Sequence, residues 1–313
     1  MIVLLETLHP DAEEILRGVD DVVHSPNPTE LPDVAGHQVT ALVTRGLGRI
    51  TRATIESLPA LRVVARCGAG LDNVDTVVAQ ARGVTVVYAP GITTGAVAEH
   101  ALMLALCLAR QTVRLAAATA RGDWAIRDGF MSRELRGLRA GIVGLGSIGS
   151  RVAELSAAFG MEVVGWTRRP RSDSTVVQVG FDELIATSDV IQLCVALTPD
   201  TAHLIGATAL ATMRPGALLV NTARGQLVDL SAIDAALQRG QLGGYATDVW
   251  DPEPPPAGTA LIGHPRVLVT PHVAAFTEAT YRELCVGPAE AIAAVLRGEP
   301  PEQRFVLAPP LGA

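Results

Sequence analysis

The sequence predicts an α/β protein that folds into two doubly wound parallel-sheet domains, and three observations support this prediction. The chain has 313 residues, which exceeds the roughly 250–300 residues at which a single hydrophobic core stops growing. Short runs rich in β-branched residues alternate with helical patterns almost throughout, as parallel α/β folds require. These runs fall into two sets, and each set is large enough to form its own sheet.

The first set of runs predicts the sheet of the amino-terminal domain. Its members are IVLL at 2–5, VTALVT at 39–44, RVVAR at 62–66 and VTVVY at 84–88. A long helical pattern follows at 93–122, opened by threonine and closed by glycine. We expect this helix to connect the two domains.

The second set predicts a larger sheet in the middle of the chain. Its members are GIVG at 141–144, EVVGW at 162–166, VIQLCV at 190–195, ALLV at 217–220, GYATDV at 244–249 and VLVT at 267–270. A helix at 147–159 should join the first two runs, and DPEPPPAG at 251–258 should form a rigid loop. We expect the closing helix, at about 277–297, to return to the first domain.

Composition excludes several classes of protein. Apolar residues make up 49% of the chain and charged residues 18%, which is typical of a globular protein rather than a disordered one. The net charge is −7 without any run of like charges, so neither a nucleic-acid surface nor a membrane surface is expected. The longest apolar stretch, 101–109, is about half the length of a membrane span.

The cysteines and the amino terminus indicate where the protein works. The four cysteines lie far apart and form no C-x-x-C pair, which favours a reduced compartment over a disulfide framework. The first apolar run ends at Glu6 and follows no basic segment, unlike a signal peptide. No cluster of His, Cys and Asp has the spacing of metal ligands, so no metal is expected. We therefore expect a soluble, cytoplasmic protein.

A glycine-rich turn predicts a dinucleotide site at the start of the second set. Gly144, Gly146 and Gly149 have the G-x-G-x-x-G spacing between a predicted strand and a predicted helix, as in a Rossmann-like βαβ unit. Gly144 permits the tight turn, Gly146 lets a pyrophosphate approach the backbone, and Gly149 allows close helix–strand packing. The amides of Ser147 and Ile148 would face the phosphates at the positive end of the helix.

The chain departs from the NAD pattern about 20 residues after this turn. NAD sites place an Asp or Glu there to bind the adenine ribose, whereas this chain has Thr167, Arg168 and Arg169. Two guanidinium groups and a hydroxyl can bind a 2′-phosphate. The sequence therefore predicts NADP(H) as the preferred cofactor, with NAD(H) possible. The alternative is that both arginines are solvated and the site binds NAD weakly.

Six motifs, in order along nearly the whole chain, resemble those of the D-isomer-specific 2-hydroxyacid dehydrogenases, and in particular the NADP-type glyoxylate and hydroxypyruvate reductases. They are RCGAGLDNVD (66–75), APGITTGAVAEHALMLALCLAR (89–110), ELRGLRAGIVGLGSIG (134–149), LLVNTARGQLVD (218–229), DVWDPEP (248–254) and TPHVAAFTEAT (270–280).

This resemblance implies a discontinuous two-domain architecture with the active site in the cleft between the domains. Residues 1–98 and 281–313 would form a flavodoxin-like substrate-binding domain, and residues 99–280 the dinucleotide-binding Rossmann domain. Members of the family typically pair into homodimers through the cofactor domain and its long helix. The apolar stretch at 101–109 suits such pairing, although an ordinary buried helix explains it nearly as well.

Three residues are the candidates for catalysis. Arg224 can bind a substrate carboxylate in a bidentate manner, and His272 can exchange a proton near neutral pH. The family pattern places a carboxylate before a proline, which fits Glu253 as the partner that would orient His272. Asp251 is the alternative partner. The formate dehydrogenases of the same superfamily carry an amide at the position of Glu253, so the carboxylate favours carbonyl chemistry.

The resemblance also implies which residues contact the cofactor and substrate. Asp248 would hold the nicotinamide carboxamide, and Thr94 would lie near the ring. The substrate carboxylate would contact Arg224, His272 and the backbone amides of one loop, and His100 is expected to be structural. The remaining cofactor contacts would be Cys194, Val195, Pro199, Thr222 and Ala223, and the substrate loop is Gly68, Ala69 and Gly70.

We expect reduction of glyoxylate, hydroxypyruvate or a similar small 2-keto acid to the D-2-hydroxy acid. A 3-phosphoglycerate dehydrogenase is an alternative, although no regulatory domain fits after the closing helix. Phosphite dehydrogenase is another, but phosphite-oxidising relatives carry a lysine where this chain has Ala69. A few relatives are cofactor-sensing corepressors. Turnover with a panel of 2-keto acids would separate enzyme from sensor.

Overall fold

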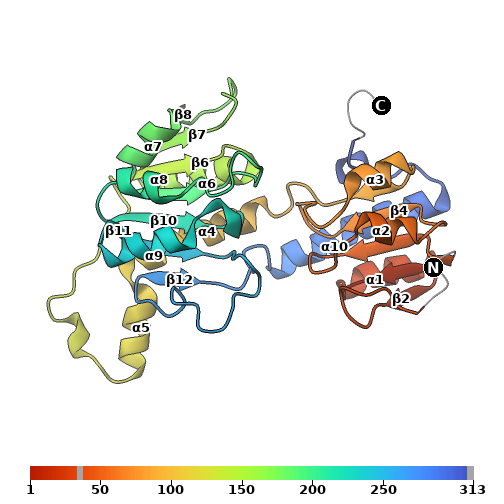
Figure 1. The fold of residues 1–313 in the computed structure, drawn as a ribbon, viewed down its shortest axis with the longest axis horizontal. Helices are drawn as coiled ribbons and strands as arrows, with labels where there is room; N and C mark the ends of the chain where they lie inside the picture. The colour runs from red at the N-terminus through yellow and green to blue at the C-terminus, as the bar shows by residue number, and fades with distance from the viewer. Residues whose placement is uncertain (34–37, 309–313) are drawn as a thin grey trace. The chain divides into compact units, whose positions relative to one another are not determined.

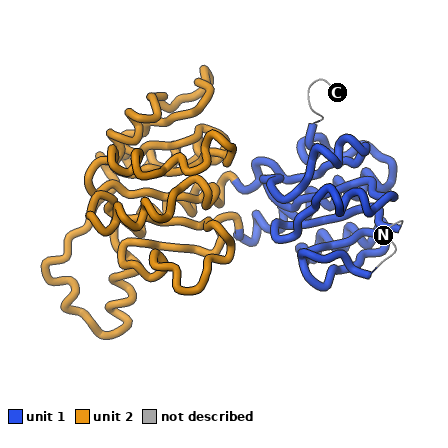
Figure 2. The backbone as a smooth tube through the Cα atoms, in the orientation of Figure 1, with its two compact units in different colours: residues 1–93, 276–313 blue, residues 94–275 orange. Residues whose placement is uncertain are grey.

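The structure, a computed structural model, describes residues 1–33 and 38–308 and divides into two compact units. Unit 1 contains residues 1–93 and 276–313, and unit 2 contains residues 94–275 (Figure 2). Unit 1 is therefore discontinuous in the sequence, since both ends of the chain contribute to it. Figure 1 labels the elements of both units.

Unit 1 is built on a five-stranded parallel sheet in the order β2-β1-β3-β4-β5. This is the flavodoxin-like order, with the reversal between β1 and β3. The strands are β1 (Ile2–Leu4), β2 (Val22–His24), β3 (Ala41–Thr44), β4 (Val63–Arg66) and β5 (Thr85–Val87). The helices are α1 (Pro10–Arg17), α2 (Arg52–Glu56), α3 (Thr76–Ala81), α10 (Glu278–Arg297) and the short η4 (Gln303–Phe305).

Helices pack on the sheet of unit 1 through a continuous apolar core. Helices α2 and α3 contribute Ile55, Val78 and Ala79 to a cluster with Val3, Leu42 and Val64 of the strands. Helix α10 packs against α1, β4 and β5, which ties the carboxyl-terminal segment to the amino-terminal one. The central strands are buried, so they read as unbroken apolar runs rather than as alternating patterns.

Unit 2 is built on a seven-stranded parallel sheet in the order β12-β11-β10-β9-β6-β7-β8. The order reverses at β6, which lies between β7 and β9, as in dinucleotide-binding folds. The strands are β6 (Arg139–Val143), β7 (Glu162–Trp166), β8 (Val177–Gln178), β9 (Val190–Leu193), β10 (Ala217–Asn221), β11 (Leu242–Thr247) and β12 (Val267–Val269).

Helices cover the sheet of unit 2 through two separate apolar clusters. One cluster joins α4 and α6 to the sheet, and the other joins α7, α8 and α9 to it. The helices are α4 (Thr94–Arg110), α5 (Thr112–Ala120), α6 (Ser147–Ala158), α7 (Phe181–Thr187), α8 (Ala207–Thr212) and α9 (Leu230–Gln238), with short η2 (Ala125–Arg127) and η3 (Gly225–Leu227). The predicted fold class, two doubly wound parallel sheets, is confirmed.

The prediction of one helix over 93–122 is wrong. Helix α4 ends at Arg110, and α5 begins at Thr112 after a bend of 63°. Gln111 adopts a left-handed backbone, with φ of +51°, and this residue breaks the hydrogen-bond ladder between the two helices. In the described part of the chain no single helix combines the length and apolar composition needed to cross a membrane; α4 and α5 meet these requirements only as a bent pair.

The sequence patterns also missed two short edge strands, β2 and β8. Strand β2 pairs with β1, and β8 contributes only two residues beside β7. Both strands are short and partly exposed, so their sequences lack the long apolar runs from which the inner strands were predicted. The other strands lie within a few residues of the predicted ranges.

Candidate active site

The predicted site residues of unit 2 lie on the loops that follow its strands. The glycine-rich turn follows β6, Thr167–Arg169 follows β7, and Cys194–Pro199 follows β9. Thr222–Arg224 follows β10, whereas Asp248 and His272 follow β11 and β12. Since all of these strands are parallel, the loops gather at one edge of the sheet, around the point where the strand order reverses. Open α/β sheets bind their ligands at this edge.

The glycine-rich turn fits a dinucleotide in its backbone geometry. Gly144 has φ of +101°, a conformation that L side chains rarely adopt. A Cβ at Gly149 would lie 1.8 Å from the carbonyl oxygen of Gly144, so α6 approaches the turn at a distance only glycine permits. A Cβ at Gly146 would meet no described heavy atom within 4 Å. The described part of the chain therefore leaves the space next to Gly146 open, where a pyrophosphate would lie.

Ser147 and Ile148 form the first turn of α6, and Gly146 is its N-cap. A helix N-terminus with exposed amides binds phosphate groups. Cys194 lies beside the turn, since a Cβ on Gly149 would come within 3.2 Å of its side chain. Burial raises the pKa of the Cys194 thiol to about 12, so this side chain is neutral and contributes packing rather than charge.

The loop after β7 carries the arginines that distinguish the chain from the NAD pattern. The Arg168 guanidinium lies 3.4 Å from the Asp200 carboxylate, and both side chains are largely exposed. Arg171 donates to the carbonyl of Leu145 at 2.6 Å and thereby ties this loop to the glycine-rich turn. Exposed pairs of this kind are weak, so Arg168 can exchange Asp200 for an anionic ligand.

The structure brings His272 and Glu253 together. Nδ1 of His272 lies 2.7 Å from Oε2 of Glu253, and Oε1 of Glu253 accepts the backbone N–H of Trp250 at 2.8 Å. The alternative carboxylate, Asp251, accepts instead from the side chain of Gln226. With Nδ1 engaged by the carboxylate, Nε2 of His272 is the ring nitrogen suited to exchange a proton with a ligand.

The environment of Glu253 keeps its carboxylate ionised at neutral pH. Partial burial raises its pKa, but the hydrogen bonds from His272 and from the Trp250 amide lower the pKa more, with help from the charge of Arg224. The net result is a pKa below the ordinary value of 4.5. Glu253 is therefore an acceptor that can hold the Nδ1 proton of His272 in place.

Arg224 lies at the start of η3, next to the end of β10. Its Nη1 donates to the carbonyl of Ala223 at 2.7 Å, and its own carbonyl accepts from the amide side chain of Asn221 at 2.9 Å. Asn221 also accepts the backbone N–H of Ala223, so one buried side chain shapes the loop Thr222–Arg224 from both ends. The guanidinium acts electrostatically on Glu253, which places Arg224 in the same cluster of charges.

Asp248 is the most buried charged residue of this group, with 1% of its side chain exposed. Its carboxylate accepts the backbone N–H groups of Val273 and Ala274 at 2.9 and 2.8 Å and the hydroxyl of Thr270 at 2.6 Å. Sequence reasoning did not single out Thr270, although it lies two residues before His272 in the same motif. His100 joins this network from α4, through a contact that spans 170 residues of sequence.

The predicted substrate loop, Gly68–Gly70, belongs to unit 1 and follows β4. Gly68 donates its N–H to the carbonyl of Arg66 at 2.8 Å and accepts from the N–H of Ala89 at 2.9 Å. A Cβ at Gly68 would contact the Arg66 guanidinium, so a larger residue here would displace the end of that side chain. Thr94, the residue expected near the nicotinamide ring, is the first residue of α4 in unit 2.

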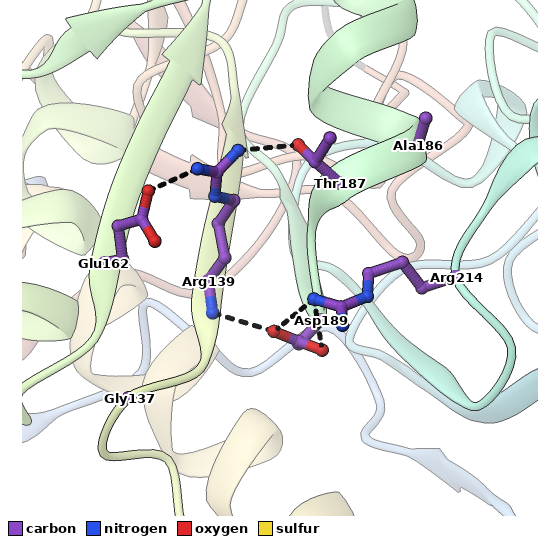
Figure 3. A pocket seen from close by; sticks show the side chains of 7 residues that line it. All are labelled: Gly137, Arg139, Glu162, Ala186, Thr187, Asp189 and Arg214. Atoms are coloured by element: carbon purple, nitrogen blue, oxygen red, sulfur yellow. Dashed lines mark hydrogen bonds and ion pairs between the residues drawn. The ribbon is translucent and has the colours of Figure 1, made fainter.

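A cavity of about 400 Å³ lies at the amino ends of the strands of unit 2, opposite the ends that carry the predicted site residues (Figure 3). Asp189, just before β9, accepts the backbone N–H of Arg139 and pairs with the guanidinium groups of Arg133 and Arg214. Arg139 in turn pairs with Glu162. These contacts link the amino ends of four strands, so the charged residues around the cavity have a structural role in holding the sheet together. Its lining residues are Gly137, Arg139, Glu162, Ala186, Thr187, Asp189 and Arg214.

Comparisons with known proteins agree with this geometry. Residues 102–274 match the model of the NAD-binding domain of D-isomer-specific 2-hydroxyacid dehydrogenases. The chain is 34% identical over 307 residues to the glyoxylate reductase of Aeropyrum pernix. This alignment covers 93% of this chain and 91% of that relative. It is also 37% identical over 306 residues to the D-3-phosphoglycerate dehydrogenase of Methanocaldococcus jannaschii, and this alignment covers 95% of this chain.

The chain spans 58% of the length of that D-3-phosphoglycerate dehydrogenase and 50% of the one from Archaeoglobus fulgidus, so it corresponds to about half of each. Among solved structures, a D-lactate dehydrogenase from Aquifex aeolicus complexed with NAD and lactic acid matches with a TM-score of 0.88 at 25% identity. The match covers 99% of this chain and 100% of that one. The chain therefore belongs to the D-isomer-specific 2-hydroxyacid dehydrogenase family.

Proposed function

We propose that this protein is an NAD(P)-dependent D-2-hydroxyacid dehydrogenase that reduces a small 2-keto acid. The observation that carries the proposal is the 2.7 Å pair of His272 and Glu253, at the same sheet edge as the glycine-rich turn. A bound nicotinamide cofactor supplies the hydride in this chemistry. The chain itself must then supply a proton, a cation for the substrate carboxylate, and a fixed orientation.

The proton is assigned to Nε2 of His272. Glu253 accepts at Nδ1, which keeps the ring in one orientation. As the substrate carbonyl oxygen gains negative charge, the protonated imidazole can donate to it from Nε2. In the direction of oxidation the neutral ring would take the hydroxyl proton instead, so the same pair serves both directions.

The substrate carboxylate is assigned to Arg224. A guanidinium presents two parallel N–H donors to a carboxylate, which fixes the orientation of the keto group as well as its position. The Asn221 side chain braces the loop that carries Arg224, so the donor comes from a rigid support. We further propose that the amides of Gly68, Ala69 and Gly70 bind the substrate, which requires the Gly68 N–H to leave the carbonyl of Arg66. Unit 1 is then the substrate-binding domain and unit 2 the dinucleotide-binding domain.

The cofactor is assigned to the glycine-rich turn and the loops beside it. The open backbone at Gly146 and the N-terminus of α6 suit the pyrophosphate, and Asp248 suits the carboxamide. We propose a preference for NADP(H), because Arg168 and Arg169 stand where NAD sites carry a carboxylate. The further proposed contacts are Ser147, Ile148, Thr167, Cys194, Val195, Pro199, Thr222, Ala223 and Thr94.

Glyoxylate or hydroxypyruvate is the proposed substrate. Relatives named glyoxylate reductase and hydroxypyruvate reductase are both 34% identical to this chain, over 93% and 82% of its length. D-3-phosphoglycerate remains the second candidate, because relatives of that name share 36–38% identity with the chain. A reduced, cytoplasmic setting suits the four cysteines, none of which forms a disulfide.

We also propose that the protein is a homodimer. Trp124 and Met131 have 68% and 84% of their surface exposed, and Val113 of α5 has 54%. All three belong to the segment that contains α5 and projects from the body of unit 2 (Figures 1 and 2). Large apolar side chains gathered on one exposed segment are typical of a surface that another chain covers.

The decisive experiment is steady-state turnover with glyoxylate, hydroxypyruvate and pyruvate, each with NADPH and with NADH. D-3-phosphoglycerate and phosphite should be tested in the oxidative direction with NADP⁺ and NAD⁺. The proposal expects the highest kcat/KM with glyoxylate or hydroxypyruvate and NADPH. Tight cofactor binding without turnover of any substrate would instead favour a cofactor-sensing binding protein.

A further inference from the structure

His100, which sequence reasoning treated as structural, is connected to the segment that carries His272. Its Nε2 lies 3.0 Å from the hydroxyl oxygen of Thr270 and 3.6 Å from Oδ1 of Asp248. The Thr270 hydroxyl lies 2.6 Å from the same carboxylate oxygen. Three elements that are distant in sequence thus meet here: α4, the end of β11 and the end of β12.

The direction of these hydrogen bonds follows from counting protons. The ionised carboxylate of Asp248 can only accept, and the Thr270 hydroxyl has a single proton. Thr270 therefore donates to Asp248 and must accept from its other neighbour. That neighbour is Nε2 of His100, so Nε2 carries a proton. The neutral tautomer protonated only at Nδ1 would place two lone pairs against each other at 3.0 Å.

Asp248 holds the backbone at His272 and at the two residues that follow it. Its side chain accepts the N–H groups of Val273 and Ala274, and its backbone carbonyl accepts the N–H of His272 at 2.8 Å. His272 has φ of +56°, in the left-handed region that non-glycine residues rarely occupy. Such a conformation persists only where the surroundings fix it firmly, and here the contacts to Asp248 do so.

We propose that His100 is a positioning residue for the reaction. Through Thr270 and Asp248, its Nε2–H fixes the segment 270–274 and with it the orientation of the His272 ring. This inference rests on the proposed function, since its consequence is measured on the proton that His272 transfers. His100 itself is not expected to contact the substrate. Its side chain is largely buried, with 15% exposed, and its ring nitrogen is engaged by Thr270.

Conservative variants separate this role from simple packing. The amide N–H of glutamine can replace Nε2–H of histidine, whereas asparagine reaches only as far as Nδ1 and leucine donates nothing. We expect His100→Gln to keep kcat within about threefold of the wild type, and His100→Asn and His100→Leu to lower kcat about 10- to 100-fold. Thr270→Ser should retain activity, and Thr270→Val should lose it. The Tm of His100→Gln should stay near that of the wild type, and across the variants kcat should fall more than the affinity for NADPH.

Spectroscopy provides a readout that does not need turnover. Long-range ¹H–¹⁵N spectra of protein labelled at its seven histidines should show a proton on Nε2 of His100. They should also show ring shifts of His272 that move in His100→Leu and return in His100→Gln. If the wild type turns over no 2-keto acid, the proposed function fails, and these spectra still decide the positioning role.

Three results would overturn the inference. The first is a His100 ring protonated only at Nδ1. The second is a His100→Leu enzyme with wild-type kcat and unchanged His272 shifts. The third is a loss of activity that follows Tm across the variants without rescue by glutamine, because packing alone would produce that pattern.

Discussion

At the scale of single residues, the pair of His272 and Glu253 gives the most specific prediction about the reaction, namely which ring nitrogen exchanges the proton. The carboxylate engages Nδ1, so the ring can exchange a proton with substrate only through Nε2. We expect His272→Ala to lower kcat by about 10²- to 10⁴-fold, the usual contribution of general acid–base catalysis. The Kd for NADPH should stay within a factor of two, because no cofactor contact is assigned to this side chain. Near-wild-type turnover would remove His272 from the mechanism.

Arg168 decides the choice between the two cofactors. Its ion pair with Asp200 is exposed and therefore weak, so a 2′-phosphate can displace it. We expect Arg168→Glu to raise the KM for NADPH at least about tenfold, since it replaces a charge-assisted bond with repulsion. The KM for NADH should change less than about twofold. Arg151→Glu, on the exposed surface of α6, is the control for an equal change in net charge.

The sequence identified most of the candidate site at this scale because the relevant residues lie in compact motifs. Gly144–Gly149 can be found by spacing alone, whereas Glu253 and His272 follow from the resemblance of the motifs that contain them. The His100–Thr270 contact could not be found this way. It joins residues 170 positions apart, and the packing of α4 against β11 and β12 brings them together.

At the scale of elements, two glycines of the glycine-rich turn are expected to have different roles, Gly149 in folding and Gly146 in cofactor binding. A Cβ at Gly149 would lie 1.8 Å from the Gly144 carbonyl, so Gly149→Ala must displace α6 from the turn. A Cβ at Gly146 meets no described atom within 4 Å, so Gly146→Ala should fold normally. We expect Gly149→Ala to lower Tm by several degrees. Gly146→Ala should keep Tm but lose NADPH affinity, because its methyl group would occupy space assigned to the pyrophosphate.

Thermal unfolding and NADPH titration of both variants test this assignment. Gly180→Ala, at the N-cap of α7 with equally open surroundings, is the matched control for the loss of a glycine. If Gly146→Ala binds NADPH as tightly as the control does, then the pyrophosphate does not lie against Gly146.

The loop after β3 depends on one buried carboxylate. Glu6 accepts the hydroxyl of Thr44 and the backbone N–H groups of residues 45–48. Burial raises the pKa of Glu6, but these hydrogen bonds outweigh it and hold the pKa below the ordinary 4.5. A carboxyl whose pKa is lower in the folded state stabilises the fold above the unfolded-state pKa. That stabilisation is lost as the pH falls through the folded-state value.

We therefore expect Glu6→Gln to reduce the free energy of unfolding by about 1–3 kcal/mol at pH 7. The difference from the wild type should shrink once the pH falls below about 4.5, as Glu6 becomes protonated in both states. Urea unfolding at several pH values measures this, with the exposed Glu56→Gln as the control. A constant difference down to pH 3 would mean that the charge of Glu6 does not stabilise the loop.

The bend between α4 and α5 shows where element prediction fails. Both helices carry good helix formers, and no glycine or proline lies between them. The break falls on Gln111, whose left-handed backbone leaves no signature in a single sequence. The short strands β2 and β8 were missed for a related reason, since their identity comes from the neighbours they pair with.

At the scale of the whole molecule, the alternation of apolar runs and helical patterns was enough to predict two parallel sheets. It could not give the order of strands within them, because strand order depends on which crossover lies on which face. The glycine-rich turn supplied one fixed point, since dinucleotide folds place this turn directly after a central strand of the sheet. The pattern of elements already predicted that the closing helix returns to the first domain, and α10 does belong to unit 1.

The projecting segment with α5 leads to the final prediction. In water, Trp124 and Met131 expose apolar surface that the described chain does not cover, and an aromatic anchor of this kind typically contributes about 2 kcal/mol or more to an interface. We expect the wild type to be a dimer by light scattering at micromolar concentration, and Trp124→Glu with Met131→Glu to be a monomer. Val177→Glu, on the equally exposed strand β8, should remain a dimer. If the double variant is still a dimer, the interface lies elsewhere. If the wild type is a monomer, the proposal of a homodimer is wrong.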